Sequence, residues 1–483
     1  MHFGLIGKIC GLLLMVFSFT MMPPVLVSWY FGDGEELPFL ISLATLLVGG
    51  LILWLPLMRH RAELQTRDGF LLVTLCWVVL SCGGALPFML SPATGLGFTD
   101  AVFESTSGLT TTGASVLSGI EDLPDAMRYY RQQLHFLGGM GIIILAIAIL
   151  PMLGVGGMQL YKAEIPGPMK EAKLTPRIAE TAKNLWYIYI FFTVSCAVLY
   201  RMAGMEWLEA IGGSFTTVST GGLAMHDDSF AVYDSLAIEM IAIVFMILAS
   251  LSFALHFAAM RSRSVLAYLR DPECRLFLGL LVIYTVVVFG GLHAWGVWQQ
   301  NEIGMREILF QTVSYATGAG LTTTDVTPWP AFVPYFLVLI SFIGGCAGST
   351  AAGMKVVRPG LVVQHSLREL RRLIHPNGVF ALRFGKRPVE DRILHAVWGF
   401  VGVYIFIAVL MALVFMGTGM DSTTALSATA ASLNNLGVGI AGVADGYADI
   451  STTAKWMMCL GMLLGRLEIF TILVLLLPMF WRQ

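Results

Sequence analysis

Charged residues are scarce in this chain. Only 12% of its 483 residues are Asp, Glu, Lys or Arg, and 57% are hydrophobic, whereas a soluble globular protein carries about 25% charged residues. Long apolar runs separate the charges, and most of these runs approach or exceed the roughly 20 residues that a helix needs to cross a bilayer. The composition excludes an ordinary soluble protein and predicts a helical membrane protein.

The residues on which enzymes and metal sites depend are also few or scattered. The seven cysteines show neither zinc-ligand spacing nor a paired framework, which favours small packing residues within helices. The nine histidines lie mostly at the ends of apolar runs or in loops, without an HExxH or paired-carboxylate motif. There is no Walker motif, and no GxGxxG follows a strand. A membrane enzyme is therefore disfavoured, and control by nucleotides would have to come from a partner.

Ten apolar segments have the length and composition of membrane spans. The first reaches Tyr30 without a small-residue cleavage motif, so we interpret it as a retained helix and not as a signal peptide. The predicted spans lie near residues 6–30, 37–58, 70–90, 131–151, 184–203, 234–258, 275–296, 331–354, 393–417 and 454–480.

Four shorter stretches rich in Gly, Ser and Thr lie between spans, at 99–115, 208–224, 305–324 and 422–440. They are too short and too polar to cross, so we predict re-entrant segments, each a short helix followed by an extended loop. With the N-terminus inside, most lysines and arginines then fall on the inner side, as the positive-inside rule requires. The exceptions are Arg128, Arg131, Arg201, Arg306, Lys455 and Arg466. Most acids fall outside, where they would concentrate cations.

The four polar stretches share a pattern: each has a glycine, and the residue three positions before that glycine carries a hydroxyl or amide side chain. A dehydrated monovalent cation needs a ring of oxygens in place of its water, and backbone carbonyls from four loops can supply one. Glycine adopts the dihedrals that aim consecutive carbonyls at one axis, and hydroxyls add further oxygens or brace the loop. The candidate filter residues are Thr110, Thr111, Thr112, Gly113, Ser219, Thr220, Gly221, Gly222, Thr317, Gly318, Ala319, Gly320, Asn434, Asn435, Leu436 and Gly437.

The predicted fold class is an all-α polytopic membrane protein. Four pseudo-symmetric helix–pore loop–helix repeats surround one central pore, and two extra N-terminal transmembrane helices precede them. The predicted units are residues 1–69 for the two extra helices and 70–183, 184–274, 275–391 and 392–483 for the repeats.

Glycines interrupt the second span of the third repeat. Residues 344–353, followed by Met354 and Lys355, make a poor continuous helix, because each glycine costs about 1 kcal/mol in a helix interior. A flexible stretch in this position could lie across the pathway below the filter, at 344–354; a kinked or closely packed helix is the alternative. The candidate gate residues are Gly344, Gly345, Gly348, Ser349, Thr350, Gly353, Lys355 and Arg466.

Arg466 lies about twelve residues into the last span. An intramembrane charge is costly, and it is usually functional or paired. The alternative for Arg466 is a structural ion pair with a carboxylate of a neighbouring repeat. Glu468 is a poor partner because it lies on a different helix face. Glu104 is a candidate brace behind the first filter loop.

Several motifs carry a family resemblance. They are SGLTTTG at 107–113, GGCAGST at 344–350, LNNLG at 433–437, GRLE at 465–468 and the long first inner loop from 154–161 to 176–177. With these motifs the chain resembles, over essentially its whole length, the Trk/Ktr/HKT superfamily of potassium-translocating subunits. Within that superfamily it resembles the TrkH/TrkG branch of bacterial Trk systems.

The resemblance implies potassium as the transported ion, with no covalent cofactor. A serine in place of the first glycine goes with sodium transport in this superfamily, whereas all four positions are glycine here. It also implies an intramembrane gating loop at 344–354, in which Ala351 and Ala352 replace common glycines and would stiffen the loop, and an electrostatic barrier at Arg466. The implied potassium contacts are Thr111, Thr112, Thr220, Gly221, Gly318, Ala319, Asn435 and Leu436.

The resemblance further implies partners and a location. These are a TrkA-like cytosolic regulatory subunit that binds NAD(H) and ATP or ADP, a homodimer, and membrane lipid in a bacterial inner membrane, with both termini cytoplasmic and no nucleic acid. The basic cluster between Lys355 and Arg392 either docks the regulator or only sets the topology. Two alternatives to a gated pore stay open: proton-coupled potassium symport by the same fold, and a secondary transporter with alternating access.

Overall fold

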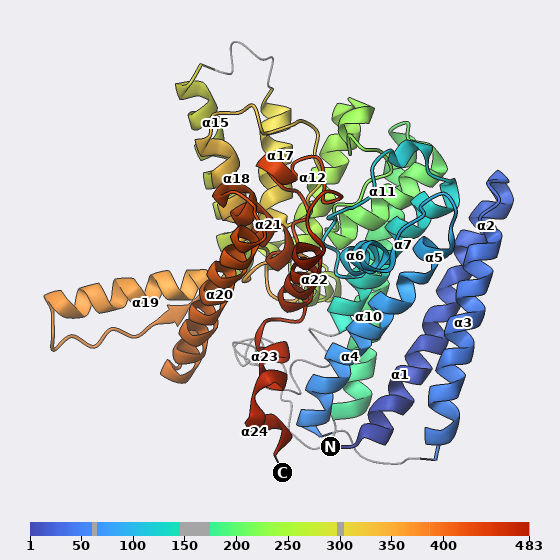
Figure 1. The fold of residues 1–483 in the computed structure, drawn as a ribbon. Coiled ribbons are helices and arrows are strands. Elements are labelled where there is room, and N and C mark those ends of the chain that lie inside the picture. The colour runs from blue at the N-terminus through green and yellow to red at the C-terminus, as the bar shows by residue number, and fades with distance from the viewer. Residues whose placement is uncertain (60–64, 145–173, 297–303, 386, 483) are drawn as a thin grey trace.

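Helices make up almost all of the structure, a computed structural model (Figure 1). Among the described residues, the β-structure consists of one antiparallel hairpin of two strands, β1 (Arg383–Phe384) and β2 (Arg387–Pro388). The structure describes residues 1–59, 65–144, 174–296, 304–385 and 387–482. The predicted all-α fold class is confirmed, with this hairpin as a minor addition.

Two long antiparallel rods stand at one edge of the molecule (Figure 1). The first consists of α1 (Phe3–Ser18), the 3-10 turn η1 (Phe19–Met21) and α2 (Met22–Phe31), and the second is α3 (Glu36–Trp54) with η2 (Leu55–Leu57). A Cβ on Gly11 would lie 2.8 Å from the Gly50 carbonyl oxygen, and one on Gly50 would lie 2.7 Å from that of Gly11. Small residues at this crossing therefore let the two backbones approach closely, as is usual between membrane helices.

Four short, mostly buried helices hold the predicted re-entrant stretches: α6 (Phe98–Leu109), α11 (Trp207–Ser219), α17 (Met305–Thr317) and α21 (Ser422–Leu433). At 12 or 13 residues each, they are too short to cross a bilayer. Other helices, all longer except α18, flank them in chain order: α4 (Thr66–Gly84) with α5 (Leu86–Leu90), α7 (Asp125–Ile144), α10 (Leu174–Met202), α12 (Leu236–Ser250), α15 (Pro272–Ala294), α18 (Phe332–Ser341), α20 (Asp391–Gly417) and α22 (Thr452–Arg466). The order of spanning helix, short helix and second helix thus recurs four times.

Three predicted spans are interrupted. The predicted span at 234–258 is bent, because α12 meets α13 (Phe253–Ser262) at 95°. The span at 454–480 breaks after α22, and α23 (Phe470–Leu476) follows at 116°. The predicted glycine-rich interruption in 331–354 is present, since α18 ends at Ser341. In the described residues, six helices are long and apolar enough to cross a membrane, or eight if each bent pair is one span.

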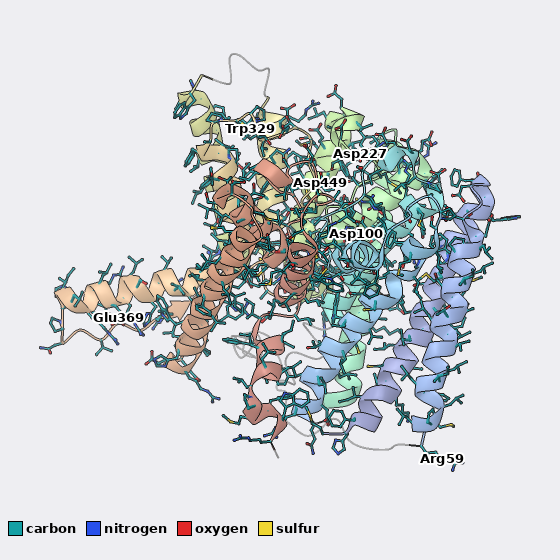
Figure 2. All side chains as sticks on the ribbon, in the orientation of Figure 1. Arg59, Asp100, Asp227, Trp329, Glu369 and Asp449 are labelled. Atoms are coloured by element: carbon teal, nitrogen blue, oxygen red, sulfur yellow. The ribbon has the colours of Figure 1, made fainter. Side chains whose placement is uncertain are left out.

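The remaining elements connect or end these helices. The N- and C-termini lie at the same end as Arg59, and Asp227 and Trp329 lie at the other (Figures 1 and 2). One helix, α19, projects sideways from the bundle (Figure 1). The connecting elements are η3 (Ile120–Asp122), η5 (Ala231–Tyr233), α14 (Leu266–Arg270), α19 (Val357–Ile374), η6 (Ala441–Val443) and α24 (Pro478–Trp481).

Candidate ion-conducting site

The shared glycines of the four loops form a closed cycle of contacts. Each has a positive φ, between 65° and 89°, which a side chain would strain. In addition, a Cβ on each glycine would press into the carbonyl oxygen that precedes the glycine of the next loop. The contacts run in order around the four repeats, from Gly113 to Gly221, from Gly222 to Ala319, from Gly320 to Leu436 and from Gly437 to Thr112. We call residues 110–113, 219–222, 317–320 and 434–437 the filter ring.

A second position with positive φ recurs in every loop, two residues before the shared glycine. It is occupied by Thr111, Thr220, Gly318 and Asn435, with φ of 51°, 54°, 71° and 48°. Left-handed backbone is uncommon outside glycine, so its presence in three non-glycine residues shows that the loops share one backbone course. Alternating left-handed and ordinary residues turn successive peptide planes, which allows neighbouring carbonyls to face the same side.

The polar side chains three residues before the glycines brace the loops. Thr110 Oγ1 donates to Thr106 O (2.6 Å), and Ser219 and Thr317 donate to carbonyls of their own helices. Asn434 accepts from the Tyr404 hydroxyl (2.5 Å) and donates to Ser341 Oγ (2.8 Å). Of the two roles open to these residues, support and further ion oxygens, the structure therefore favours support.

The fourth loop is tied directly to the first. Asn435 Nδ2 donates to Thr112 Oγ1 (2.8 Å) and to Met462 O (2.9 Å). Asn435 Oδ1 and Thr111 Oγ1 are buried and have no hydrogen-bond partner in the described part of the chain. Buried polar atoms are nearly always satisfied, so these two oxygens at the ring are available to a water molecule or an ion.

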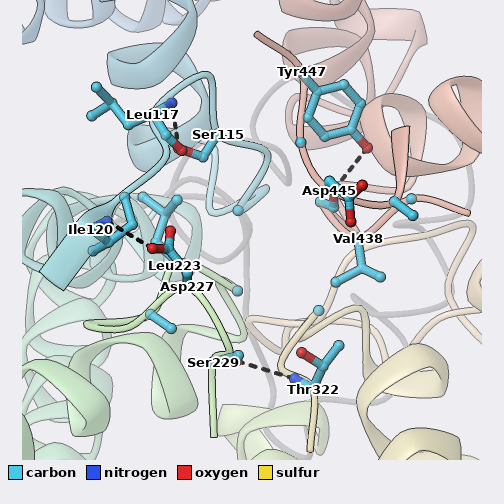
Figure 3. A pocket seen from close by; sticks show the side chains of 18 of the residues that line it. Ser115, Leu117, Ile120, Leu223, Asp227, Ser229, Thr322, Val438, Asp445 and Tyr447 are labelled. Carbon is cyan, nitrogen blue, oxygen red and sulfur yellow. Dashed lines mark hydrogen bonds between the residues drawn. The ribbon is translucent and has the colours of Figure 1, made fainter. Parts of the chain in front are cut away.

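A cavity of about 180 Å³ opens on the filter ring at the end of the molecule away from the termini, where Asp227 lies (Figure 2), and all four shared glycines line it; we call it the outer cavity. Asp227 and Asp445 reach this cavity from different loops (Figure 3). A neighbouring cavity of about 540 Å³ is lined by the same two aspartates together with Asp228 and Asp325. The approach to the ring is therefore acidic, which raises the local concentration of cations.

A buried ion pair supports the first loop from behind. Glu104 accepts from Arg131 Nε (2.8 Å) and from the backbone N–H of Val116 (3.1 Å), and Ser115 Oγ lies 3.1 Å from both of its oxygens. The predicted brace at Glu104 is thus present. The sequence marked its partner Arg131 only as one of the six basic residues that do not fall on the inner side, and did not predict the pair with Glu104.

The predicted gating loop, residues 344–354, lies directly against the ring. A Cβ on Gly318 would lie 3.7 Å from Ala352 Cβ. Backbone hydrogen bonds join the two ends of the loop, from Met354 N to Phe342 O and from Val356 N to Gly345 O, both 2.9 Å. The candidate residues Gly344, Gly348, Gly353 and Lys355 all have positive φ, between 70° and 81°. An irregular loop, and not a kinked helix, therefore fills this stretch.

The bend between α12 and α13 receives this loop. Cys346 N donates to Ser250 O (2.9 Å) and Phe253 N donates to Gly348 O (3.0 Å). Backbone groups released by the helix break are thereby satisfied within the protein, as membrane depth requires. The bend at 251–252 went unpredicted because the pairing that stabilises it comes from another repeat.

Charged side chains hold the gating loop. Arg466 donates to Thr350 O (3.0 Å) and to Gly138 O (3.2 Å), and no carboxylate pairs with it in the described residues. Lys355 donates to Ala351 O, and Ser349 Oγ donates to Cys346 O (2.6 Å). The structure therefore brings Arg466 together with the candidate gate residue Thr350, and the ion pair considered for Arg466 is not present there.

Glu468 has a partner that the sequence did not reveal. It pairs with Arg358 (2.7 Å), which also donates to Met354 O (2.9 Å) and lies over the ring of Phe400. This contact joins the inner end of the gating loop to the break between α22 and α23. It was missed because the two residues are 110 positions apart.

Comparisons with known proteins agree with this architecture. The family described as TrkH, cation transport protein, matches residues 38–483. The chain is 50% identical over 490 residues to the Trk system potassium uptake protein TrkH of Halomonas elongata, and 36% identical to TrkG of Escherichia coli K12; both matches span all of this chain and at least 99% of the relative. The crystal structure of the potassium transporter TrkH from Vibrio parahaemolyticus superposes with a TM-score of 0.92 at 46% identity, with full coverage of both chains.

Proposed function

The chain belongs to the TrkH cation transport family, and from that premise we propose that it takes up potassium ions across the bacterial inner membrane through the filter ring. The single observation that carries this proposal is the closed cycle of glycine and carbonyl contacts that joins all four loops. A pore for a dehydrated cation needs such a ring of backbone oxygens. The relatives named above are potassium uptake proteins, which supports potassium as the cargo and transport, not catalysis, as the activity.

The proposed ion contacts are backbone carbonyls at the two positions before each shared glycine. They are Thr111, Thr112, Thr220, Gly221, Gly318, Ala319, Asn435 and Leu436. Four of these carbonyls lie where a Cβ on the neighbouring loop's glycine would intrude. A side chain at the shared position would therefore narrow the ring, which favours glycine where the larger potassium ion passes.

The gating loop is the proposed closure of this pathway. It lies against the inner side of the ring at Ala352, and Arg466 places a positive charge at Thr350. A buried cation in an ion pathway repels other cations in a low-dielectric setting. We expect the loop and Arg466 to move together when the pore opens.

Regulation from the cytosol belongs to the same proposal. The basic residues that follow the gating loop, from Lys355 to Arg392, are a surface on which a TrkA-like NAD(H)- and ATP- or ADP-binding subunit would dock, with both termini on the same cytoplasmic side. The arm formed by α19 projects from the bundle with exposed Leu370 and Leu373. A second copy of the chain, in a homodimer surrounded by lipid, would cover this apolar surface.

Flux through the purified chain in proteoliposomes tests the proposal. Wild type and Gly113→Ser are compared under opposed potassium and sodium gradients, with and without a proton gradient. We expect selective potassium flux in the wild type and a loss of preference in Gly113→Ser. Potassium flux that requires the proton gradient would favour symport by the same ring, and equal preference in both proteins would contradict the filter ring.

A further inference from the structure

One histidine lies between the first and second filter loops. His135, in the middle of α7, is fully buried. Its Nδ1 is 2.9 Å from Gly108 O in the last turn of α6, and its Nε2 accepts a hydrogen bond from Leu223 N (3.0 Å). Leu223 directly follows the shared glycine of the second loop. The imidazole therefore connects the helix that precedes one loop with the backbone that leaves the next.

The two partners fix the tautomer of this histidine. A backbone N–H can only donate and a carbonyl can only accept, so Nε2 must be unprotonated and Nδ1 must carry the proton. The imidazole is consequently neutral, and the neutral form suits a site with two cations nearby: Arg131 lies one turn before it on the same helix, and Arg466 donates to Gly138 O shortly after it. Only a group with one donor and one acceptor at these two positions satisfies both contacts.

The imidazole of His135 explains why the second filter loop has an extra glycine. The residue before the shared glycine is Thr112, Ala319 or Leu436 in the other three loops, but Gly221 in the second. Gly221 does not have a positive φ, unlike Gly222. However, a Cβ on Gly221 would lie 2.6 Å from Cγ and Nδ1 of His135. The second loop thus has a glycine at this position because the imidazole occupies the space of a side chain.

We propose that His135 is a positioning residue for ion selectivity, which sets the place of the Gly221 carbonyl in the filter ring. The imidazole of His135 packs against Gly221, and its Nε2 accepts the hydrogen bond from Leu223 N. The Gly221 carbonyl is the one that Gly113 of the first loop faces. His135 therefore fixes the seam between the first and second loops. This inference rests on the proposed function.

Two substitutions separate the contacts of His135. His135→Asn retains an amide near Nδ1, toward Gly108, but cannot reach Leu223. His135→Gln places an amide oxygen near Nε2 and keeps an acceptor for Leu223 N. We expect the potassium-to-sodium flux ratio in proteoliposomes to fall about tenfold in His135→Asn, because a buried N–H loses its acceptor, and to stay within about twofold of wild type in His135→Gln.

A matched control lies on the same helix. Gln133 is buried and donates to Thr20 O (2.6 Å) in the N-terminal rod, away from the filter ring. Gln133→Asn shortens the side chain and removes one buried hydrogen bond, so it reports a loss of stability alone. The potassium-to-sodium flux ratio of Gln133→Asn should equal that of the wild type, even if less protein is recovered.

The outcomes are distinguishable. A wild type without potassium flux, even with a proton gradient and with the cytosolic regulatory subunit added, would contradict the proposed function itself. A selective wild type with an unchanged ratio in His135→Asn, or with equal falls in the Asn and Gln variants, would overturn only the role of His135. If His135→Asn does not fold, Gly221→Ala tests the same seam: pressure of the new methyl group on the imidazole should lower the ratio, and an unchanged ratio would overturn the inference.

Discussion

The filter ring and the gating loop use the same residue types but are held in different ways. Both are buried, rich in Gly, Ser and Thr, and contain backbone with positive φ. Neutral hydrogen bonds brace two seams of the ring, between Asn435 and Thr112 and between His135 and Leu223. The gating loop is held by backbone hydrogen bonds at its ends and at the α12–α13 bend, and in addition by the charged side chains of Arg466, Lys355 and Arg358.

From this difference we expect the gating loop, and not the ring, to move. Because each loop of the ring packs on the next, a shift of one loop would disturb its neighbours, so we expect the ring to keep one geometry. A loop that depends in part on charged contacts near the break after α22 can be released by changes at those contacts, as in other two-state switches. The comparison predicts that substitutions in the ring change which ion passes, or abolish transport, and that substitutions at the gate change how fast it passes.

The largest effect is expected from an alanine in the ring. In Gly320→Ala the new methyl group would collide with the Leu436 carbonyl, at a residue whose φ is 65°. Strain and overpacking of this kind cost a few kcal/mol, so potassium uptake should fall about 100-fold. Uptake by cells that depend on this protein provides the measurement.

Gly402→Ala is the matched control, because its methyl group would meet nothing within 4 Å in α20. It should transport like the wild type. If Gly320→Ala also transports normally, the contact cycle does not constrain the pathway.

Removal of the charge at the gate should have the next largest effect. Arg466→Gln abolishes a buried positive charge next to Thr350 O. Flux through the chain alone should then rise about tenfold, because the electrostatic barrier to cations is lowered. Stopped-flow flux in proteoliposomes measures the change.

Arg466→Lys keeps the charge and serves as the control for the lost hydrogen bonds. It should conduct at close to the wild-type rate. Equal rises in both variants would show that the hydrogen bond, and not the charge, closes the pathway.

A smaller gain is expected at the break between α22 and α23. Glu468→Gln removes the charge partner of Arg358, in a pair whose two side chains are mostly buried. Loss of one partner of a buried pair is destabilising, so the inner end of the gating loop should loosen and flux should rise about threefold.

Glu369→Gln is the matched surface substitution, since Glu369 pairs with Arg372 on the exposed arm α19. Exposed pairs contribute little, so no change in flux is expected. A flux in Glu468→Gln equal to that of Glu369→Gln would mean that the Arg358 pair does not hold the gate.

The smallest effect is expected at the acidic cavities that lead to the filter ring. Asp445→Asn removes one carboxylate from both outer cavities. The half-saturating potassium concentration should rise about twofold at low ionic strength and return to the wild-type value at high salt, because screening weakens the attraction of exposed charges. Asp449→Asn is the control, because Asp449 is exposed and lines neither cavity. An equal rise of the half-saturating potassium concentration in both variants would argue against local attraction by Asp445.

Local patterns in the sequence predicted much of this architecture. The four polar stretches and their shared glycines stand out because periodicity, length and glycine chemistry are properties of nearby residues. The interruption after α18 was predicted for the same reason, since several glycines follow one another there.

The contacts that join repeats could not be predicted in this way. The pair of Arg358 and Glu468 and the bond from Asn435 to Thr112 join residues 110 and 323 positions apart, so no local pattern reveals them. The bend between α12 and α13 depends on pairing with the gating loop. His135 had one signal, the extra glycine at Gly221, whose meaning becomes clear only when the imidazole is seen against it.

The inner loop at 154–173, part of the family resemblance, lies outside the described residues. The proposed regulation by a cytosolic subunit therefore stays a prediction. Binding of the purified chain to such a subunit, with and without the basic cluster from Lys355 to Arg392, is its natural test.

Anomalous diffraction from crystals grown in thallium ions, which replace potassium, tests the central claim most directly. The account predicts anomalous peaks on one axis, within reach of the carbonyl oxygens of Thr112, Gly221, Ala319 and Leu436, and their loss in Gly320→Ala. Peaks elsewhere in the protein, with none inside the filter ring, would contradict the claim that the four loops form one ion pathway.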